Sequence, residues 1–83
     1  MEIIFAERAK RDWDKLDNKI KNQIRKKLKF YLKSTNPLRF AEKLKDPKLG
    51  MYRFLIGDWR VIFDYLENKI YILRIAHRKD IYR

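Results

Sequence analysis

The stretch MYRFLIGDWRVIFDYLENKIYILRIAHRKDIY, residues 51–82, decides the fold that the sequence predicts. Three runs within it, at 51–56, 59–66 and 70–77, are rich in β-branched and aromatic residues, which strands prefer. Gly57-Asp58 separates the first two runs and has the composition of a two-residue hairpin turn. The stretch therefore predicts three consecutive strands of an antiparallel sheet.

This turn also determines which residues share a face of the sheet. With Gly57-Asp58 as the loop, Arg53 lies opposite Ile62, and Leu55 lies opposite Arg60. Side chains alternate between the two faces of a strand, so one face becomes almost entirely apolar and should pack under helices. The members of this apolar face are Tyr52, Phe54, Ile56, Trp59, Val61, Phe63 and Tyr65.

The opposite face of the hairpin carries two arginines. Its members are Arg53, Leu55, Arg60, Ile62 and Asp64. Arg53 and Arg60 are diagonal neighbours, about 7–8 Å apart at the backbone. Two guanidiniums at that separation can hold one phosphate or two adjacent ones. The alternative for each arginine is an ion pair, with Asp58 and Asp64 available to Arg60, or a position in solvent.

The register of the third strand depends on the length of the loop before it. A three-residue loop at 67–69 would bury Tyr71, Leu73 and Ile75, and would place Arg74 on the face of Arg53 and Arg60. A two-residue loop would reverse these faces. We expect the three-residue loop, because it keeps Arg74 out of the helix-facing core.

The first half of the chain predicts one strand and two helices. Residues 1–6 form a short β-type run, and 7–16 has the apolar spacing of a short amphipathic helix. Asp17 is a suitable N-cap for a second, longer helix that ends near Ser34. Its apolar stripe consists of Ile20, Ile24, Leu28 and Leu32. Residues 35–50, with two prolines and a glycine, form a linker.

The predicted fold is α+β, in the order β-α-α-β-β-β, with an αα-hairpin on one face of a small, mostly antiparallel four-stranded sheet.

Length and composition define the class of protein. The 83 residues form one predicted domain, 1–83, and the absence of cysteine excludes disulfides and cysteine–zinc sites. No apolar run is long enough for a membrane helix, and no signal-peptide pattern is present, so we expect a cytoplasmic protein with no membrane partner. The net charge of +11 and the pI of about 10.1 favour a polyanionic partner, whereas the alternative reading is a lysine-rich bias that serves solubility.

Further candidate residues lie at the end of the last strand and on the second helix. His77 is the only histidine and could act as a general base, but it has no Cys, Asp or Glu at metal-ligand spacing, so no metal site is expected. Tyr82 either ends the core or contacts a nucleotide. The helix lysines are either a solvated face or a source of affinity for RNA phosphates. The predicted RNA-binding residues are Arg74, Lys79, Lys26 and Lys27.

The order of the elements and two motifs, YRFLIGDWRVIF at 52–63 and LRIAHRKDIY at 73–82, resemble the RelE/ParE superfamily of toxins from type II toxin–antitoxin modules. The likeness spans essentially the whole chain. The ending HRxxxY is similar to the RelE branch rather than the ParE branch.

The resemblance implies a metal-independent, cofactor-free endoribonuclease that cleaves mRNA in the ribosomal A site through attack of a 2′-hydroxyl on the adjacent phosphate. Matching positions would make Arg53 a basic residue of the first hairpin strand, Arg60 a phosphate-holding residue, Arg78 a leaving-group residue and Tyr82 a nucleotide-positioning residue. Leu55 stands where many members have a second basic residue, so His77 is the expected substitute base. With these four it completes the predicted catalytic set.

The resemblance also implies partners and leaves two rival functions. The expected partners are an acidic antitoxin, the ribosome and mRNA, with operator DNA contacted only through the antitoxin. With Arg83 as the last residue, we expect no further C-terminal helix of the kind some members have. The rivals are a ParE-like inhibitor of DNA gyrase and a catalytically weak member that acts only through antitoxin and DNA binding.

Overall fold

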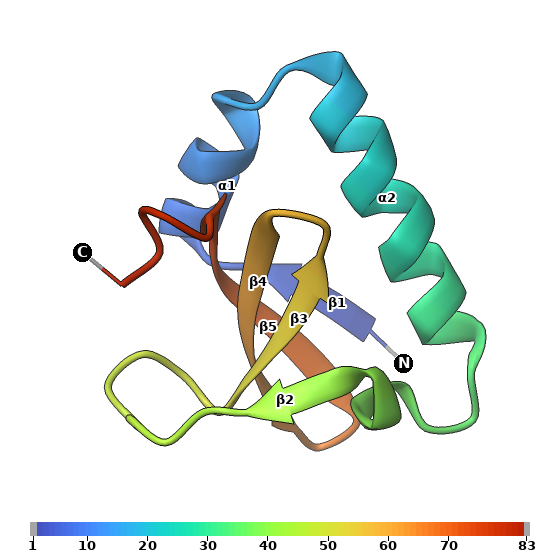
Figure 1. Cartoon of the computed structure of the whole chain (residues 1–83). Coiled ribbons are helices and arrows are strands. Elements are labelled where there is room, and N and C mark those ends of the chain that lie inside the picture. The colour runs from blue at the N-terminus through green and yellow to red at the C-terminus, as the bar shows by residue number, and fades with distance from the viewer. Residues whose placement is uncertain (1, 83) are drawn as a thin grey trace.

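Two helices and a five-stranded sheet form the fold, as the computed structural model of residues 2–82 shows (Figure 1). The elements in chain order are β1 (Glu2–Phe5), α1 (Glu7–Asp14), α2 (Asn18–Lys33), the short 3₁₀ helix η1 (Pro37–Phe40), β2 (Ala41–Lys43), β3 (Tyr52–Ile56), β4 (Trp59–Leu66) and β5 (Lys69–His77). The predicted α+β class is therefore confirmed. Met1 and Arg83, which belong to the predicted first strand run and the predicted domain, lie outside the described residues.

The sheet contains one strand more than the sequence predicts. Its strand order is β1-β5-β4-β3-β2, with β1 parallel to β5 and every other pair antiparallel. The additional strand is β2, which lies in the segment predicted as a linker. It has only three residues, and its sequence Ala-Glu-Lys is depleted in strands. Pairing with β3 places Glu42 opposite Arg53, a contact that no local pattern could indicate.

The two hairpins of the sheet differ in how well their turns could be predicted. The β3–β4 hairpin has the predicted register, with Arg53 opposite Ile62, and its turn residue Gly57 has a φ of 59°. The predicted three-residue loop between β4 and β5 is wrong: Leu66 pairs with Lys69 across a two-residue turn. Glu67 and Asn68 both have positive φ, 51° and 62°, as a tight hairpin turn requires.

A β-bulge at Leu73 restores part of the predicted arrangement of β5. Phe63 pairs with Ile72 but Ile62 pairs with Arg74, so Leu73 is an extra residue that exchanges the two faces of the strand. Arg74 consequently lies on the face of Arg53 and Arg60, as expected, despite the shorter loop. The expected burial of Tyr71 and Leu73 is wrong, because Ile70 and Ile72 occupy the core in their place.

Both helices contribute to one hydrophobic core on the apolar face of the sheet. Asp17 caps α2 by accepting a hydrogen bond from Ile20 N at 2.9 Å, as predicted. The ring of Tyr31 lies 4.7 Å from that of Phe54, which in turn lies 4.5 Å from that of Phe63. The buried members of this core are Ala9, Ile24, Leu28, Tyr31, Phe54, Ile56, Val61, Phe63, Ile70, Ile72 and Ile75. No helix within residues 2–82 is long and apolar enough to cross a membrane.

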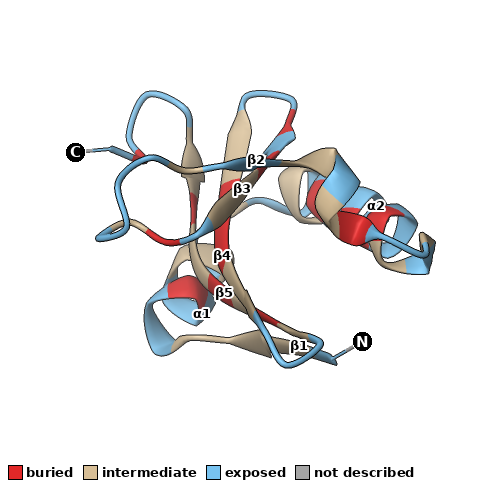
Figure 2. Cartoon of the chain, turned by 90° about the horizontal axis from the view of Figure 1, so that it is seen from below, coloured by how far each residue is buried: buried red, intermediate tan, exposed pale blue. Residues whose placement is uncertain are grey.

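The chain after β5 turns back on the side of the sheet away from α2 (Figure 2). Asp80 N and Ile81 N both donate to the carbonyl oxygen of His77, at 2.8 and 3.1 Å. Ile81 is buried, as is Ile62 of the arginine-bearing face, and neither belongs to the main core. Burial of Ile81 fixes the position of the residue that follows it, Tyr82.

Candidate nucleic-acid interface

Arg53 is the centre of a three-residue contact on the face of the sheet opposite the helices. Its Nε donates to Glu42 Oε1 at 2.9 Å, and its Nη2 lies 2.7 Å from the same oxygen. Its Nη1 donates to the hydroxyl of Tyr82, and its guanidinium carbon lies 5.7 Å from the centroid of the Tyr82 ring. Two segments distant in sequence, β2 and the C-terminal turn, therefore hold one arginine in place.

The carboxylate of Glu42 sets the electrostatics of this cluster. Its hydrogen bond raises the pKa of Arg53, an effect that burial opposes and the bond to Tyr82 assists. The guanidinium therefore stays charged, but an adjacent carboxylate offsets its charge. A phosphate that approaches Arg53 must compete with Glu42 for the same donors.

Arg60 lies on the same face and is held by backbone carbonyls. Its Nη1 donates to the carbonyl oxygens of Gly57 at 2.9 Å and Trp59 at 3.0 Å. Neither of the aspartates considered from the sequence pairs with it. Asp64 Oδ1 accepts from Met51 N at 2.9 Å, while Asp58 pairs with Arg78. The structure of residues 2–82 thus fixes Arg60 without neutralising its charge.

Arg78 is anchored to the β3–β4 turn through its backbone. Its N donates to the carbonyl oxygen of Asp58 at 2.7 Å, and its Nε lies 3.6 Å from Asp58 Oδ1. The side chain of Arg78 is 58% exposed and that of Asp58 is 65% exposed, so this ion pair is weak. The next residue, Lys79, is also exposed. Arg60 and Arg78 therefore contact the same short turn, Arg60 through Gly57 and Arg78 through Asp58.

The structure does not bring His77 together with Arg53 and Tyr82. His77 pairs with Trp59 across the sheet, on the face that carries the core, and its ring lies edge-on to the indole at 5.5 Å. Its Nδ1 accepts a hydrogen bond from Lys79 N at 3.2 Å. The ring borders a cavity of about 310 Å³ beside α1 rather than the arginine face.

Arg74 shares the face of Arg53 and Arg60, but its side chain contacts α1. Its Nε lies 2.9 Å from Asp12 Oδ2, the same oxygen that accepts from Ile75 N at 2.9 Å. Strand β1 pairs with β5 only as far as Ile72. Asp12, whose side chain is 13% exposed, thus supplies an acceptor where the neighbouring strand has ended. The contact indicates a structural role for Arg74.

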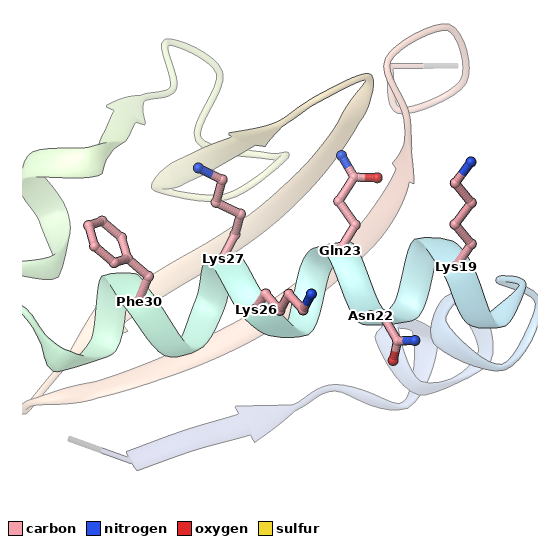
Figure 3. A pocket seen from close by; sticks show the side chains of 6 residues that line it. All are labelled: Lys19, Asn22, Gln23, Lys26, Lys27 and Phe30. Carbon is pink, nitrogen blue, oxygen red and sulfur yellow. The ribbon is translucent and has the colours of Figure 1, made fainter.

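The two predicted RNA-binding lysines of α2 line a groove on the outer side of that helix (Figure 3). The groove has a volume of about 600 Å³, and we call it the α2 groove; its residues are Lys19, Asn22, Gln23, Lys26, Lys27 and Phe30. Lys19 belongs to the helix lysines already considered as a source of affinity for RNA phosphates, so sequence reasoning missed Asn22, Gln23 and Phe30. The two rows 19–23–27 and 22–26–30, each with i, i+4 spacing, are the pattern that could have revealed the others.

Sequence reasoning also missed Glu42 and the loop that follows it. Lys43, Leu44, Lys45, Asp46 and Leu49 surround a cavity of about 300 Å³ that Arg53 and Tyr82 complete. Lysines in this short loop were read as part of a linker. Within residues 2–82, no three His, Cys, Asp or Glu side chains lie close enough together to hold a metal ion.

Comparison with known proteins identifies the family. The model of the ParE toxin of type II toxin–antitoxin systems, parDE, matches residues 3–82. A search of the curated proteins found no match. Solved structures give the same architecture. A chain of the RelBE2 toxin–antitoxin complex from Mycobacterium tuberculosis is 26% identical, with a TM-score of 0.75 over 93% of this chain and 96% of that one.

Two further structures share the fold at lower identity. A chain of the RelB–RelE complex from Methanococcus jannaschii is 24% identical, with a TM-score of 0.73 over 95% of this chain and 94% of that one. The isolated RelE toxin from E. coli is 23% identical, with a TM-score of 0.71 over 98% of this chain and 89% of that one. The chain therefore belongs to the ParE toxin family within the RelE/ParE superfamily of type II toxin–antitoxin toxins.

Proposed function

We propose that this toxin is a ribosome-dependent endoribonuclease that cleaves mRNA in the A site. The observation that carries the proposal is the contact of the Arg53 guanidinium with the Tyr82 hydroxyl on a sheet face that also bears Arg60. Arg78 lies at the end of that face, beside the β3–β4 turn. Three cations and a phenol along one face of a rigid sheet suit recognition of an RNA phosphate and its nucleotide.

The proposed reaction needs no cofactor. The 2′-oxygen forms a bond to the adjacent phosphorus while the bond from phosphorus to the 5′-oxygen breaks, which leaves a 2′,3′-cyclic phosphate and a 5′-hydroxyl. One proton leaves the 2′-hydroxyl, and one reaches the departing 5′-oxygen. The negative charge that develops on the phosphoryl oxygens is stabilised by Arg53 and Arg60, and Arg78 faces the leaving group.

Tyr82 has a defined part in this arrangement. Its hydroxyl oxygen accepts a hydrogen bond from Arg53, so its own proton remains to be donated to RNA. The guanidinium of Arg53 lies at the hydroxyl end of the ring and the residue is half exposed, so the ring can also contact a base. Tyr82 thus orients the nucleotide beside the phosphate.

Neither residue considered as the general base supplies one on the arginine face. Leu55, at the position where the resemblance implies a basic residue, is 39% exposed and contributes no proton acceptor. His77 lies on the other face, next to Trp59. Catalysis by the described residues therefore rests on positioning and charge stabilisation, which together supply much of the rate enhancement in many enzymes.

The proposed partners follow from charge and from the relatives. The structures of the M. tuberculosis and M. jannaschii relatives are complexes of a toxin with its antitoxin. A net charge of +11 suits an acidic antitoxin as well as mRNA and ribosomal RNA. We propose that operator DNA is contacted only through the antitoxin.

Expression of the toxin without an antitoxin tests the proposal. Growth arrest should be accompanied by cleavage of translated messages at fixed codon positions, detected by primer extension. Arg60→Ala and Arg78→Ala should abolish both effects, and co-expression of an antitoxin should restore growth. Arrest of translation with ribosome-bound mRNA intact would contradict the proposal.

A ParE-like inhibitor of DNA gyrase is the second candidate. It is favoured by the ParE family match and by the positions of the two residues considered as the general base: Leu55 has no basic group, and His77 lies on the other face. This candidate predicts trapped gyrase–DNA complexes, a DNA damage response and intact messages. A member that only binds antitoxin and DNA would cause neither mRNA cleavage nor gyrase trapping.

A further inference from the structure

The α2 groove combines three kinds of side chain that bind nucleic acid. Lys19, Lys26 and Lys27 supply positive charge, Asn22 and Gln23 supply amide donors and acceptors, and Phe30 supplies an aromatic ring. Figure 3 shows Lys19, Gln23 and Lys27 projecting from the same side of the helix. The groove contains no carboxylate among its lining residues. Its chemistry therefore differs from that of a helix face that is merely charged.

Phe30 is exposed yet held in a fixed position. It is 60% exposed, the most of any large apolar residue in the described chain. Its ring centroid lies 5.6 Å from that of Phe40 and 6.1 Å from that of Tyr31, and those two rings stack at 4.8 Å. An exposed ring supported by two others is a stacking platform that loses little conformational entropy when a base binds.

The α2 groove meets the arginine face at the β3–β4 turn. A Cβ atom added to Gly57 would lie 2.6 Å from Gln23 Nε2, so the groove contacts this turn directly. The carbonyl oxygen of Gly57 accepts from Arg60, and that of Asp58 accepts from Arg78 N. The turn thus separates the groove from two arginines by the thickness of a single hairpin loop.

We propose that the α2 groove binds single-stranded RNA that continues over the Gly57-Asp58 turn from Arg60 and Arg78. The inference rests on the proposed function, because the arginine end of this track is where the message would be cleaved. Lysines would contact phosphates, the two amides would contact base edges, and Phe30 would stack on a base. From Lys19 to Phe30 the helix rises about 16 Å, the length of a few nucleotides. The paired amides and the direct junction with Arg60 favour RNA over an acidic peptide.

Binding of RNA of different lengths tests the proposal without cleavage. Oligouridylates that carry 2′-O-methyl groups cannot undergo 2′-hydroxyl attack, so fluorescence anisotropy reports binding alone. Wild type should bind a strand of about twelve nucleotides at least tenfold more tightly than one of about four, which cannot span both surfaces. The variant Lys19→Gln/Lys27→Gln should lose this length dependence and keep the affinity for the short strand.

A matched variant separates the groove from general charge. Lys29→Gln/Lys33→Gln removes the same charge from exposed residues of the same helix that do not line the groove. The groove variant is Lys19→Gln/Lys27→Gln. For the long strand, it should lower the slope of log affinity against log salt by about 1.4, because each lost phosphate contact contributes about 0.7. The matched variant should lower this slope by less than half as much. Phe30→Leu should weaken binding of the long strand about fivefold or more, with its melting temperature measured as a control for lost packing.

Three outcomes would overturn the inference alone. Equal losses in the groove variant and the matched variant would indicate that charge alone drives binding. Absence of length dependence in wild type would place all binding on the arginine face. Binding of polyglutamate that depends on the groove, with RNA binding unchanged in the groove variant, would assign the groove to an acidic peptide.

Two further outcomes separate the inference from the proposed function. A wild-type protein that binds the RNAs but leaves translated messages intact would contradict only the proposed function. Absence of RNA binding would contradict both.

Discussion

The two basic surfaces of this toxin hold their charges in different ways. On the arginine face, every guanidinium has partners: Arg53 contacts Glu42 and Tyr82, and Arg60 contacts two backbone carbonyls. Within residues 2–82, the side chains of Lys19, Lys26 and Lys27 in the α2 groove have no hydrogen bond or ion pair. The arginines are therefore pre-organised, as the proposed reaction would require, whereas the lysine side chains are free to follow a phosphate backbone.

This difference between fixed arginines and free lysines predicts which substitutions should reduce activity or binding most. A fixed guanidinium loses geometry as well as charge when it is replaced, and the groups that hold it lose their partner. A free lysine loses only a screened charge. Substitutions on the two surfaces should therefore differ in size and in kind.

The largest effect should come from Arg53. If the proposed reaction holds, Arg53→Gln should lower single-turnover cleavage of ribosome-bound mRNA about 100-fold or more, since in that reaction Arg53 stabilises the developing phosphoryl charge. Lys26→Gln, which removes a cation from the α2 groove, should lower cleavage less than about threefold. Similar losses in the two variants would show that the arginine face has no special role.

Loss of Asp12 should have the largest effect on stability. Asp12→Ala leaves Arg74 and the N–H of Ile75 without their acceptor and should lower the free energy of unfolding by about 2–4 kcal/mol. Asp14→Ala, on the exposed side of the same helix, should change it by less than about 0.5 kcal/mol. Urea denaturation measures both, and equal effects would contradict the bracing role of Asp12.

Removal of the Glu42 carboxylate should increase RNA affinity, whereas loss of an arginine or lysine should decrease it. Glu42→Gln frees Arg53 for phosphate, so RNA affinity should rise a few-fold and the salt slope should steepen by roughly 0.7. Glu2→Gln makes the same charge change at the exposed first residue of β1 and should leave the slope nearly unchanged. In the Arg53→Gln background, Glu42→Gln should have no further effect. A gain in RNA affinity from Glu42→Gln in the Arg53→Gln background would show that Glu42 acts through the overall charge and not through Arg53.

The smallest effect should be that of the groove lysines on stability. Lys19→Gln/Lys27→Gln should change the free energy of unfolding by less than about 0.5 kcal/mol, because neither side chain has a partner to lose. Thermal melting followed by circular dichroism measures this. A larger loss would mean that these lysines brace the fold and are not free for a ligand.

The sequence predicted the β3–β4 hairpin because Gly57-Asp58 is a strong local signal, and the pairing of Arg53 with Ile62 followed from it. The β4–β5 loop was wrong because Glu67-Asn68 lacks the glycine that usually marks positive φ. Arg74 nevertheless reached the expected face, through a bulge at Leu73 that no local pattern revealed.

The candidate site was predicted only in part, since long-range contacts decide it. Glu42 belongs to a three-residue strand that exists through its pairing with β3, so it could not be separated from the linker. His77 and Tyr82 are five residues apart but lie on opposite faces of the sheet, because burial of Ile81 directs the turn toward the arginines. Sequence spacing alone could not distinguish the two sides.

The chemical ends of cleaved messages test the central claim most directly. In a reconstituted translation reaction, wild-type toxin should produce mRNA fragments that end in a 2′,3′-cyclic phosphate and begin with a 5′-hydroxyl, at fixed codon positions. Arg53→Gln and Tyr82→Phe should reduce these ends sharply while the proteins stay folded. Messages that remain intact with wild-type toxin, while translation or gyrase is blocked, would contradict the account.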